Sequence, residues 1–254
     1  MKKRTNRIRL WAVLAWLLVW QAAGMAFARL WPNGHLLLAT PLTALVRLAH
    51  LSLTAAFWQA VGGSALRIIG GFLLACALAV LLAALSARFR AAEEFLYPAV
   101  AAVKAVPVVS FIILLLVWLD AEELSLFISA LMVFPPVYLN VLAGIRTADG
   151  NLLEMARVFR VPFGRQVRGI YLPAVLPHFR AAASLALGLC WKAGIAAEVI
   201  GLPQGTIGEA LYQVKVYFET GDLFAWTAVI VAVSVLFERV FLRLTDALAG
   251  KAVL

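Results

Sequence analysis

The chain has 254 residues, of which 64% are hydrophobic and 14% charged, and its mean hydropathy is +0.96. Soluble globular proteins contain about 45–50% hydrophobic and about 25% charged residues, so this composition excludes a water-soluble single core and a disordered chain. The net charge of +9 does not indicate nucleic-acid binding, because no basic, aromatic-interleaved soluble face accompanies it. We therefore expect an all-α membrane protein, because helices satisfy their own backbone polar groups in hydrocarbon.

Six apolar runs are each long enough to cross the bilayer, which takes about 20 helical residues. They cover residues 8–28, 66–86, 99–119, 124–145, 180–201 and 223–242. The first run follows a basic arm but exceeds the roughly 7–15 apolar residues of a signal peptide, so we interpret it as an uncleaved span. Residues 30–63 are too broken by prolines, glycines and charges to cross, and we expect an amphipathic outer segment there, with Leu45, Leu48 and Ala49 on one face.

These runs divide the chain into an N-terminal part, residues 1–63, and a core transmembrane domain, residues 64–254. With six spans, fifteen of the 22 basic residues fall on the side that holds both termini, and four fall on the other side. Basic residues are enriched in cytoplasmic loops. The distribution therefore predicts a multi-pass protein with both termini in the cytoplasm.

The longest inside loop, residues 149–173, is patterned like a pair of short helices. Asn151 and Glu154 have capping-box spacing, and Val161-Pro162 ends the first helix. A stripe of apolar residues recurs at helical spacing along it, formed by Leu152, Met155, Ala156 and Phe159. The pattern predicts a helix-turn-helix knob, bounded by Pro162 and Pro173, that docks into a groove of a soluble partner. An amphipathic hairpin lying on anionic lipid is the alternative.

The same loop resembles the EAA-loop signature, E-A-A-x3-G-x9-I-x-L-P, of inner-membrane permeases of ABC importers. Glu154, Ala156, Ile170, Leu172 and Pro173 match its spacing, whereas Met155 replaces an alanine and Arg160 replaces the glycine. Other stretches resemble the nitrate/sulfonate/taurine branch: residues 64–72, 104–107, 134–146 and 190–198. The resemblance covers about residues 60–243.

The resemblance implies a homodimeric type I ABC importer permease in the bacterial inner membrane, with a cytoplasmic ATPase below and an extracytoplasmic solute-binding protein above. It implies that the ATPase-coupling residues are Leu152, Glu154, Met155, Ala156, Phe159, Gly164, Ile170, Leu172 and Pro173. The chain itself contains no G-x4-G-K-[ST] phosphate loop, so ATP and magnesium are expected on the partner subunit. The solute would be small, either anionic or heteroaromatic.

Two other functions are compatible with a chain of this composition. An intramembrane enzyme would also hide polar residues within its spans. However, the histidines are scattered at His35, His50 and His178, so no metal-ligand cluster is predicted. The two cysteines, Cys76 and Cys190, lie in apolar runs and form no CxxC pair. The Gly62–Ala65 stretch lacks a nucleophile motif, and we interpret it as a helix N-cap. A secondary transporter should show internal repeats, which the sequence lacks.

Charges and prolines inside spans indicate where a pathway would run, because they are costly in hydrocarbon unless they serve water, a partner or a substrate. The candidates for the translocation path or gate are Lys104, Pro107, Pro135, Trp191, Lys192 and Glu198. A packing kink is the alternative for the prolines, and a structural ion pair or snorkelling is the alternative for the charges. The outer segment, residues 202–220, carries an apolar face that would support a docking surface or gate, or simply pack on the spans.

Overall fold

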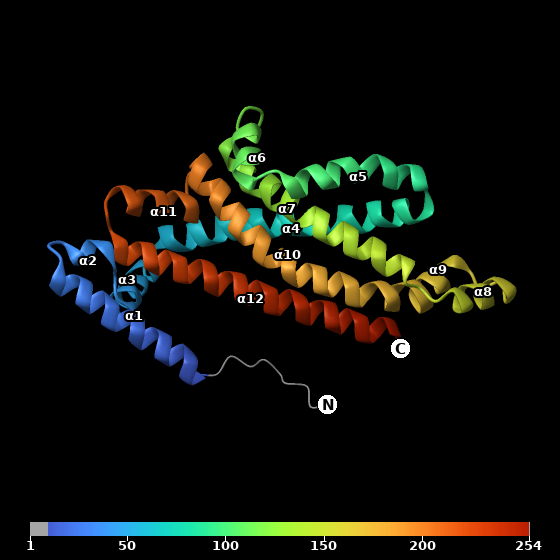
Figure 1. Cartoon of the computed structure of the whole chain (residues 1–254), viewed down its shortest axis with the longest axis horizontal. Coiled ribbons are helices and arrows are strands. Elements are labelled where there is room, and N and C mark those ends of the chain that lie inside the picture. The colour runs from blue at the N-terminus through green and yellow to red at the C-terminus, as the bar shows by residue number, and fades with distance from the viewer. Residues whose placement is uncertain (1–9, 254) are drawn as a thin grey trace.

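The computed structural model describes residues 10–253, and every regular element within them is helical (Figure 1). The elements, in chain order, are α1 (Leu10–Leu30), α2 (Gly34–Leu37), α3 (Pro41–Ser52), α4 (Ala55–Arg88), α5 (Arg90–Ala105), α6 (Val108–Leu115), α7 (Ala121–Arg146), α8 (Gly150–Val158), α9 (Phe163–Gln166), the π-helical turn η1 (Val167–Tyr171), α10 (Leu172–Gly201), α11 (Ile207–Val216) and α12 (Thr220–Val253). The predicted all-α class is confirmed.

Five of these helices are long and apolar enough to cross a membrane: α1, α4, α7, α10 and α12. The remaining predicted span, residues 99–119, is not one straight helix. It is divided between α5 and α6, which are bent by 105° at Val106 and Pro107. Proline lacks the N–H that a continuing helix needs, so the helix ends before Pro107 and restarts after it. The two pieces make a sixth span only when counted together.

Helix α4 begins eleven residues before the predicted span at residue 66 and runs unbroken through the boundary at residues 63 and 64. Its N-cap is Thr54, whose hydroxyl accepts a hydrogen bond from the Phe57 amide at 3.3 Å. The interpretation of Gly62–Ala65 as an N-cap is therefore wrong, because apolar packing carries the helix through the two glycines despite their low helix propensity. Ser64 is left inside the helix, in the buried core.

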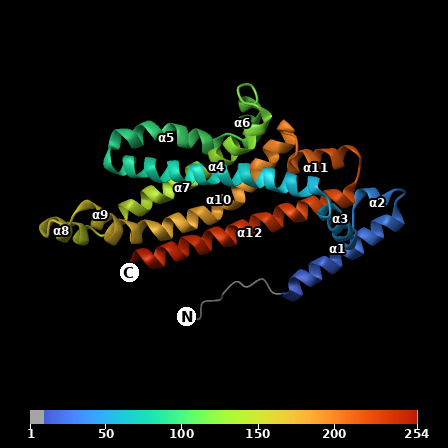
Figure 2. The ribbon, with the colours of Figure 1, turned by 180° about the vertical axis from the view of Figure 1, so that it is seen from behind.

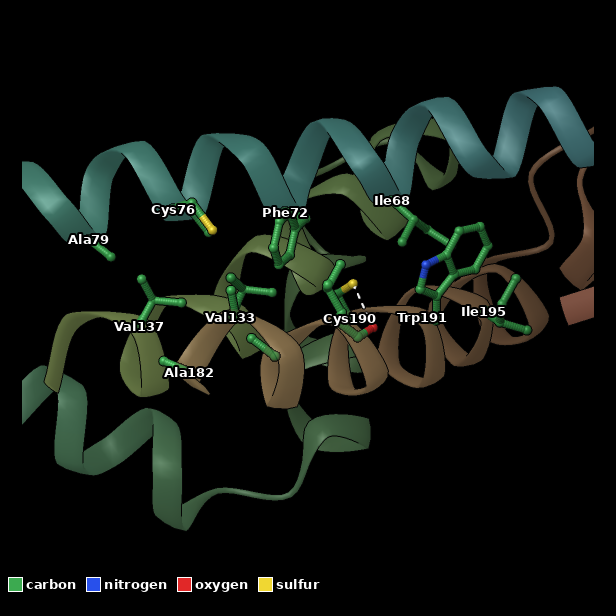
Figure 3. Close-up of a cluster of buried hydrophobic side chains, with 14 of the residues drawn as sticks. Ile68, Phe72, Cys76, Ala79, Val133, Val137, Ala182, Cys190, Trp191 and Ile195 are labelled. Atoms are coloured by element: carbon green, nitrogen blue, oxygen red, sulfur yellow. Dashed lines mark hydrogen bonds between the residues drawn. The ribbon is translucent and has the colours of Figure 1, made fainter. Parts of the chain in front are cut away.

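The core lies between α4, α7 and α10, and Figure 3 shows its centre. Ile68 and Phe72 extend from α4 toward α10, where Trp191 and Cys190 meet them, and Val133 of α7 fills the space beside them. All five side chains are buried. Tyr138 of α7 adds a polar link toward the α8 end by donating its hydroxyl to Ser86 of α4 at 2.9 Å.

Two glycines allow this close contact. A Cβ atom on Gly71 would lie 2.3 Å from the carbonyl oxygen of Leu126, and one on Gly194 would lie 2.5 Å from the hydroxyl of Ser129. Neither position has room for a side chain. Small residues at helix interfaces let membrane helices pack through van der Waals contact, which is their main source of association in lipid. The backbones of α4, α7 and α10 are therefore held at fixed distances.

The molecule is elongated, and its two ends differ (Figures 1 and 2). One end carries α8 and α9, the turn between α4 and α5, and the C-terminal end of α12. The opposite end carries α2, α3 and α11. Helix α3 is too short to span a membrane, as predicted for residues 30–63, but residues 55–63 of that segment belong to the long helix α4. We call these the knob end and the α11 end.

Candidate functional site

The break between α5 and α6 lies beside a turn of α10. Val108 and Phe111 of α6 pack in the same apolar cluster as Ala193 and Ala197 of α10. Further along, a Cβ on Gly201 would lie 3.7 Å from the side chain of Leu116. The two helices therefore run alongside each other, with the start of α6 near the turn that carries Ala193.

Two lysines lie near this break, one of them by its position in the sequence and the other by the packing of its neighbour. Lys104 is the penultimate residue of α5, and Lys192 directly precedes Ala193. Both are exposed on the isolated chain, and neither forms an ion pair with any residue that the structure describes. Pro107, the N-cap of α6, is exposed as well. These three residues lie on the surface of the subunit, outside its core.

The other three predicted path residues are buried. Pro135 lies inside α7, which continues through it, and Trp191 packs in the core near Ile68 (Figure 3). Glu198, near the C-terminal end of α10, has no exposed surface at all. The six candidates thus separate into an exposed group and a buried group.

Glu198 forms the centre of a polar junction at the α11 end. Its Oε2 accepts a hydrogen bond from the Ser64 hydroxyl at 2.7 Å and another from the Gly208 amide at 3.2 Å. The Ser64 hydroxyl in turn accepts from the Ile207 amide at 2.9 Å. The amides of Ile207 and Gly208 belong to the first turn of α11, whose N–H groups have no partner within the helix and whose dipole favours a carboxylate. The junction therefore fastens α11 to both α4 and α10.

Gly208 brings α11 this close. A Cβ atom there would lie 2.2 Å from the Cβ of Glu198 and 2.5 Å from its backbone carbonyl carbon. The chain reaches this position by a sharp turn, in which Leu202 adopts a left-handed conformation with φ of 53° and ends α10. Thr206 then caps α11 by accepting a hydrogen bond from the Glu209 amide at 3.1 Å.

Ser64 and Gly208 were not among the predicted site residues. A signal for Ser64 exists in the sequence, because Ser64, Ile68 and Phe72 recur at helical spacing and share the buried face of α4. A polar residue on an otherwise apolar face indicates a buried hydrogen-bond partner. The partner itself, Glu198, lies 134 residues away, and local pattern does not reveal that pairing.

At the knob end, α8 forms the predicted first helix, but its cap differs from the prediction. Asp149 is the N-cap, and its carboxylate accepts a hydrogen bond from the Asn151 amide at 2.8 Å. The capping interpretation of Asn151 is wrong, because the N-cap is two residues earlier, at Asp149, and the helix begins at Gly150. Ala156 is only 3% exposed and packs inside the knob, whereas Phe159 is 73% exposed.

The most exposed apolar side chains of the knob form a surface that is largely uncovered within the described part of the chain. They are Leu152, Met155, Val158, Phe159 and Phe163. Glu154 and Gly164 are exposed beside them. The predicted apolar stripe thus divides into one buried member, Ala156, and members that face outward.

The turn after α8 has the hydrogen bonds of a Schellman motif. The Val161 amide donates to the Ala156 carbonyl at 2.8 Å, and the Arg160 amide donates to the Arg157 carbonyl at 3.1 Å. Arg160 has φ of 50°, the left-handed conformation that glycine usually provides at this position. The backbone therefore adopts the shape that glycine favours even though the residue is arginine.

The second knob helix is not a separate unit. From Phe163 the chain continues through α9 and η1 into α10, without a break, to Gly201. Pro173 lies within this continuous helix, two residues after the end of the π-helical turn η1, so it does not bound the knob as predicted. Pro162 does precede α9 as its N-cap. Ile170 and Leu172 lie in this continuous helix, and both are partly buried.

Residues 71–252 match the family described as "Binding-protein-dependent transport system inner membrane component". The chain belongs to this family. The permease is 30% identical over 210 residues to a Bacillus subtilis protein described as an aliphatic sulfonates transport permease, which covers 82% of this chain and 75% of the relative. The predicted class, a multi-pass inner-membrane permease of a type I ABC importer, is confirmed.

Two other relatives carry different names. The permease is 25% identical over 186 residues to a bicarbonate transport system permease protein of Synechococcus elongatus, covering 72% of this chain and 66% of the relative. It is 27% identical over 135 residues to a nitrate import permease protein of the same species, covering 53% of this chain and 48% of the relative.

Proposed function

We propose that two copies of this permease form the translocation path of an ATP-driven importer, with an ATPase docked at the knob end and a solute-binding protein at the α11 end. The family assignment supports this arrangement. The observation that carries it is the knob, which presents exposed apolar side chains on a short helix at one end of the bundle (Figure 1). An amphipathic helix of this kind fits a groove on a soluble partner.

The knob end is assigned to the cytoplasm. The turn between α4 and α5, the end of α7, the knob and the second half of α12 lie toward this end. They carry most of the basic residues in the described part of the chain: Arg88, Arg90, Arg146, Arg157, Arg160, Arg165, Arg168, Arg239 and Arg243. The positive-inside rule favours this orientation. The five basic residues of the N-terminal arm support the same orientation from sequence, although they lie outside the described residues.

The knob transmits motion because its second half is part of a span. Displacement of α8 by the ATPase acts on the turn at Arg160, and α9 continues from there into α10. A continuous helix moves as a rigid body rather than bending as a loop would. Phe159 and Met155 make the contact in this proposal, and the buried Ala156 maintains the shape of the knob.

The path itself runs along the surface that carries Lys104, Pro107 and Lys192. Charged side chains on membrane helices face water or protein rather than lipid, so an exposed, unpaired lysine indicates a face that a second copy covers around a hydrated pathway. Two lysines that form no ion pair within the described residues favour an anionic solute. The relatives' names, which refer to sulfonates, bicarbonate and nitrate, agree with that choice.

Helix α11 serves as the outer gate element in this proposal. It lies between α10 and α12 at the end opposite the knob, and the Ser64–Glu198 junction sets its position. Glu198 is buried, so it acts on the path by holding α11 in place and not by contacting the solute.

Co-purification tests the proposal directly. The Phe159→Asp variant should lose its ATPase subunit and its solute uptake while the permease remains folded in the membrane. Phe89→Asp is the matched control, because Phe89 is also exposed at the knob end but lies in the turn between α4 and α5. Retention of ATPase and uptake by Phe159→Asp would show that the knob does not couple the two subunits.

A further inference from the structure

A pocket of about 350 Å³ opens at the α11 end, between α1, α3 and the connection from α11 to α12. This volume is within the range of ordinary small-ligand sites. We call it the α1–α12 pocket. Gly24 and Ala28 of α1 form one wall, Thr43 and Arg47 of α3 form another, and the connection contributes a third. None of the residues proposed for the path or the knob lines it.

The pocket contains an incompletely satisfied charge. Asp222 is 7% exposed, and its Oδ1 has no hydrogen-bond partner in the part of the chain that the structure describes. The Arg47 Nε lies 3.6 Å from this oxygen, which is longer than the roughly 2.7–2.9 Å of a charge-assisted hydrogen bond. The Arg47 side chain remains half exposed, with donors available to a ligand. Glu219 adds a second, exposed carboxylate to the lining.

The position of the pocket along the spans suits a lipid headgroup. Gly24 and Ala28 are in the last two turns of α1, and Asp222 is in the first turn of α12, so the pocket is at the ends of two spans. Exposed aromatic side chains surround the same end of the molecule: Trp31, Trp58, Tyr217 and Phe218. Such residues concentrate at membrane–water interfaces.

The surroundings also suit acyl chains. Helix α1 is almost entirely exposed along its apolar length, and it diverges from α12 toward its N-terminal end (Figures 1 and 2). Contact with α12 includes the ring pair of Trp20 and Phe224, whose centroids are 5.1 Å apart. A lipid whose headgroup enters the pocket can therefore extend its chains along α1.

We propose that the α1–α12 pocket binds the headgroup of phosphatidylethanolamine, with Arg47 holding the phosphate and Asp222 and Glu219 holding the ammonium group. Two carboxylates and one guanidinium give the lining a net negative charge, which disfavours a purely anionic headgroup. An ammonium group donates hydrogen bonds to carboxylates, whereas the trimethylammonium of phosphatidylcholine has no N–H to donate. The bound lipid connects α1 and α3 to the core.

Native mass spectrometry of the purified full-length permease tests this with three lipids of identical acyl chains. Phosphatidylethanolamine should bind at least about tenfold more tightly than phosphatidylcholine or phosphatidylglycerol, as expected for hydrogen bonds to a charged group. Soluble phosphoethanolamine at the same concentration should compete weakly. Equal binding of the three lipids, a preference for phosphatidylglycerol, or equally tight binding of soluble phosphoethanolamine would overturn the assignment.

Variants locate the site. Asp222→Asn should abolish the preference for phosphatidylethanolamine, and Glu219→Gln, at an exposed position that tolerates change, should reduce it by about threefold. Asp246→Asn is the matched control, because Asp246 also pairs with an arginine, Arg180, at 2.9 Å but lies far from the pocket. If Asp222→Asn does not fold, Glu219→Gln decides the question. An unchanged preference in the folded pocket variants would place the lipid elsewhere.

Discussion

The two ends of the permease use polar and apolar groups in opposite ways. At the α11 end, the carboxylate of Glu198 and the hydroxyl of Ser64 are buried and bonded to the first turn of α11. At the knob end, apolar side chains such as Met155 of the nine-residue helix α8 and Phe159, its C-cap, are exposed. A buried polar group is costly unless its partners are all present, whereas an exposed apolar group costs little in the subunit alone.

This difference separates stability from assembly. Substitutions in the Ser64–Glu198 junction should change the folding of the permease itself, because each leaves a partner unpaired inside the bundle. Substitutions on the exposed face of the knob should leave folding unchanged and act on partner binding. The following experiments test that separation, in order of expected effect.

The largest effect is expected from Gly208→Ala. The added Cβ would lie within 2.5 Å of Glu198, including its backbone, so α11 must move away from α10. Overpacking that the backbone cannot relieve should cost more than about 3 kcal/mol, visible as a lower unfolding temperature in detergent and loss of uptake. Gly188→Ala is the matched control in α10, because its Cβ would meet nothing within 4 Å. Equal stability of the two variants would show that α11 is not held by close contact.

The next largest effect is expected from Glu198→Ala. It removes the acceptor of the Ser64 hydroxyl and the Gly208 amide, which should destabilise the permease by about 2–3 kcal/mol. A double-mutant cycle with Ser64→Ala should give a coupling energy above about 1 kcal/mol, because the two residues share one network. Additive effects of the two substitutions would contradict the junction. Denaturant unfolding followed by tryptophan fluorescence measures both the destabilisation and the coupling energy.

A much smaller change in stability is expected from Phe159→Ser on the knob. Phe159 is largely exposed, so the free energy of unfolding should change by less than about 0.5 kcal/mol. Uptake should nevertheless be lost, because the contact with the ATPase is removed. Destabilisation similar to that of Glu198→Ala would show that the exposed face of the knob packs on the permease itself, and the contrast between the two ends would fail.

Much of this architecture follows from the sequence, because apolar length alone identifies membrane helices. The knob was also predictable, since helical spacing and Pro162 mark α8 and its end. The start of α4 was not predictable. Gly62 and Gly63 indicate the start of a helix unless it is known that Phe57 and Ala60, in the preceding turns, pack on the core. The bend at Pro107 has a local cause, but its 105° angle depends on how α6 packs against α10.

The site was predictable to a similar degree. Glu198 was recognisable as a charge inside a span, but its partners depend on the three-dimensional arrangement of α4, α10 and α11. Lys104 and Lys192 were recognisable for the same reason, and the structure adds that both lie on the surface of the subunit. Pairing between distant helices is set by tertiary packing, which periodicity in one segment does not encode.

The last expected effect is local to the turn at Arg160, which connects the exposed knob to the buried spans. Arg160 adopts a left-handed conformation, which costs residues with a Cβ about 1 kcal/mol relative to glycine. Arg160→Gly should therefore strengthen the hydrogen bond from the Val161 amide to the Ala156 carbonyl and slow amide hydrogen exchange at Val161 by about fivefold. Arg160→Ala is the control, because it also removes the arginine side chain but keeps the strained backbone. If amide exchange at Val161 is equally fast in the glycine and alanine variants, the turn is not strained. Arginine in place of the family's glycine would then have no effect on the stability of the knob.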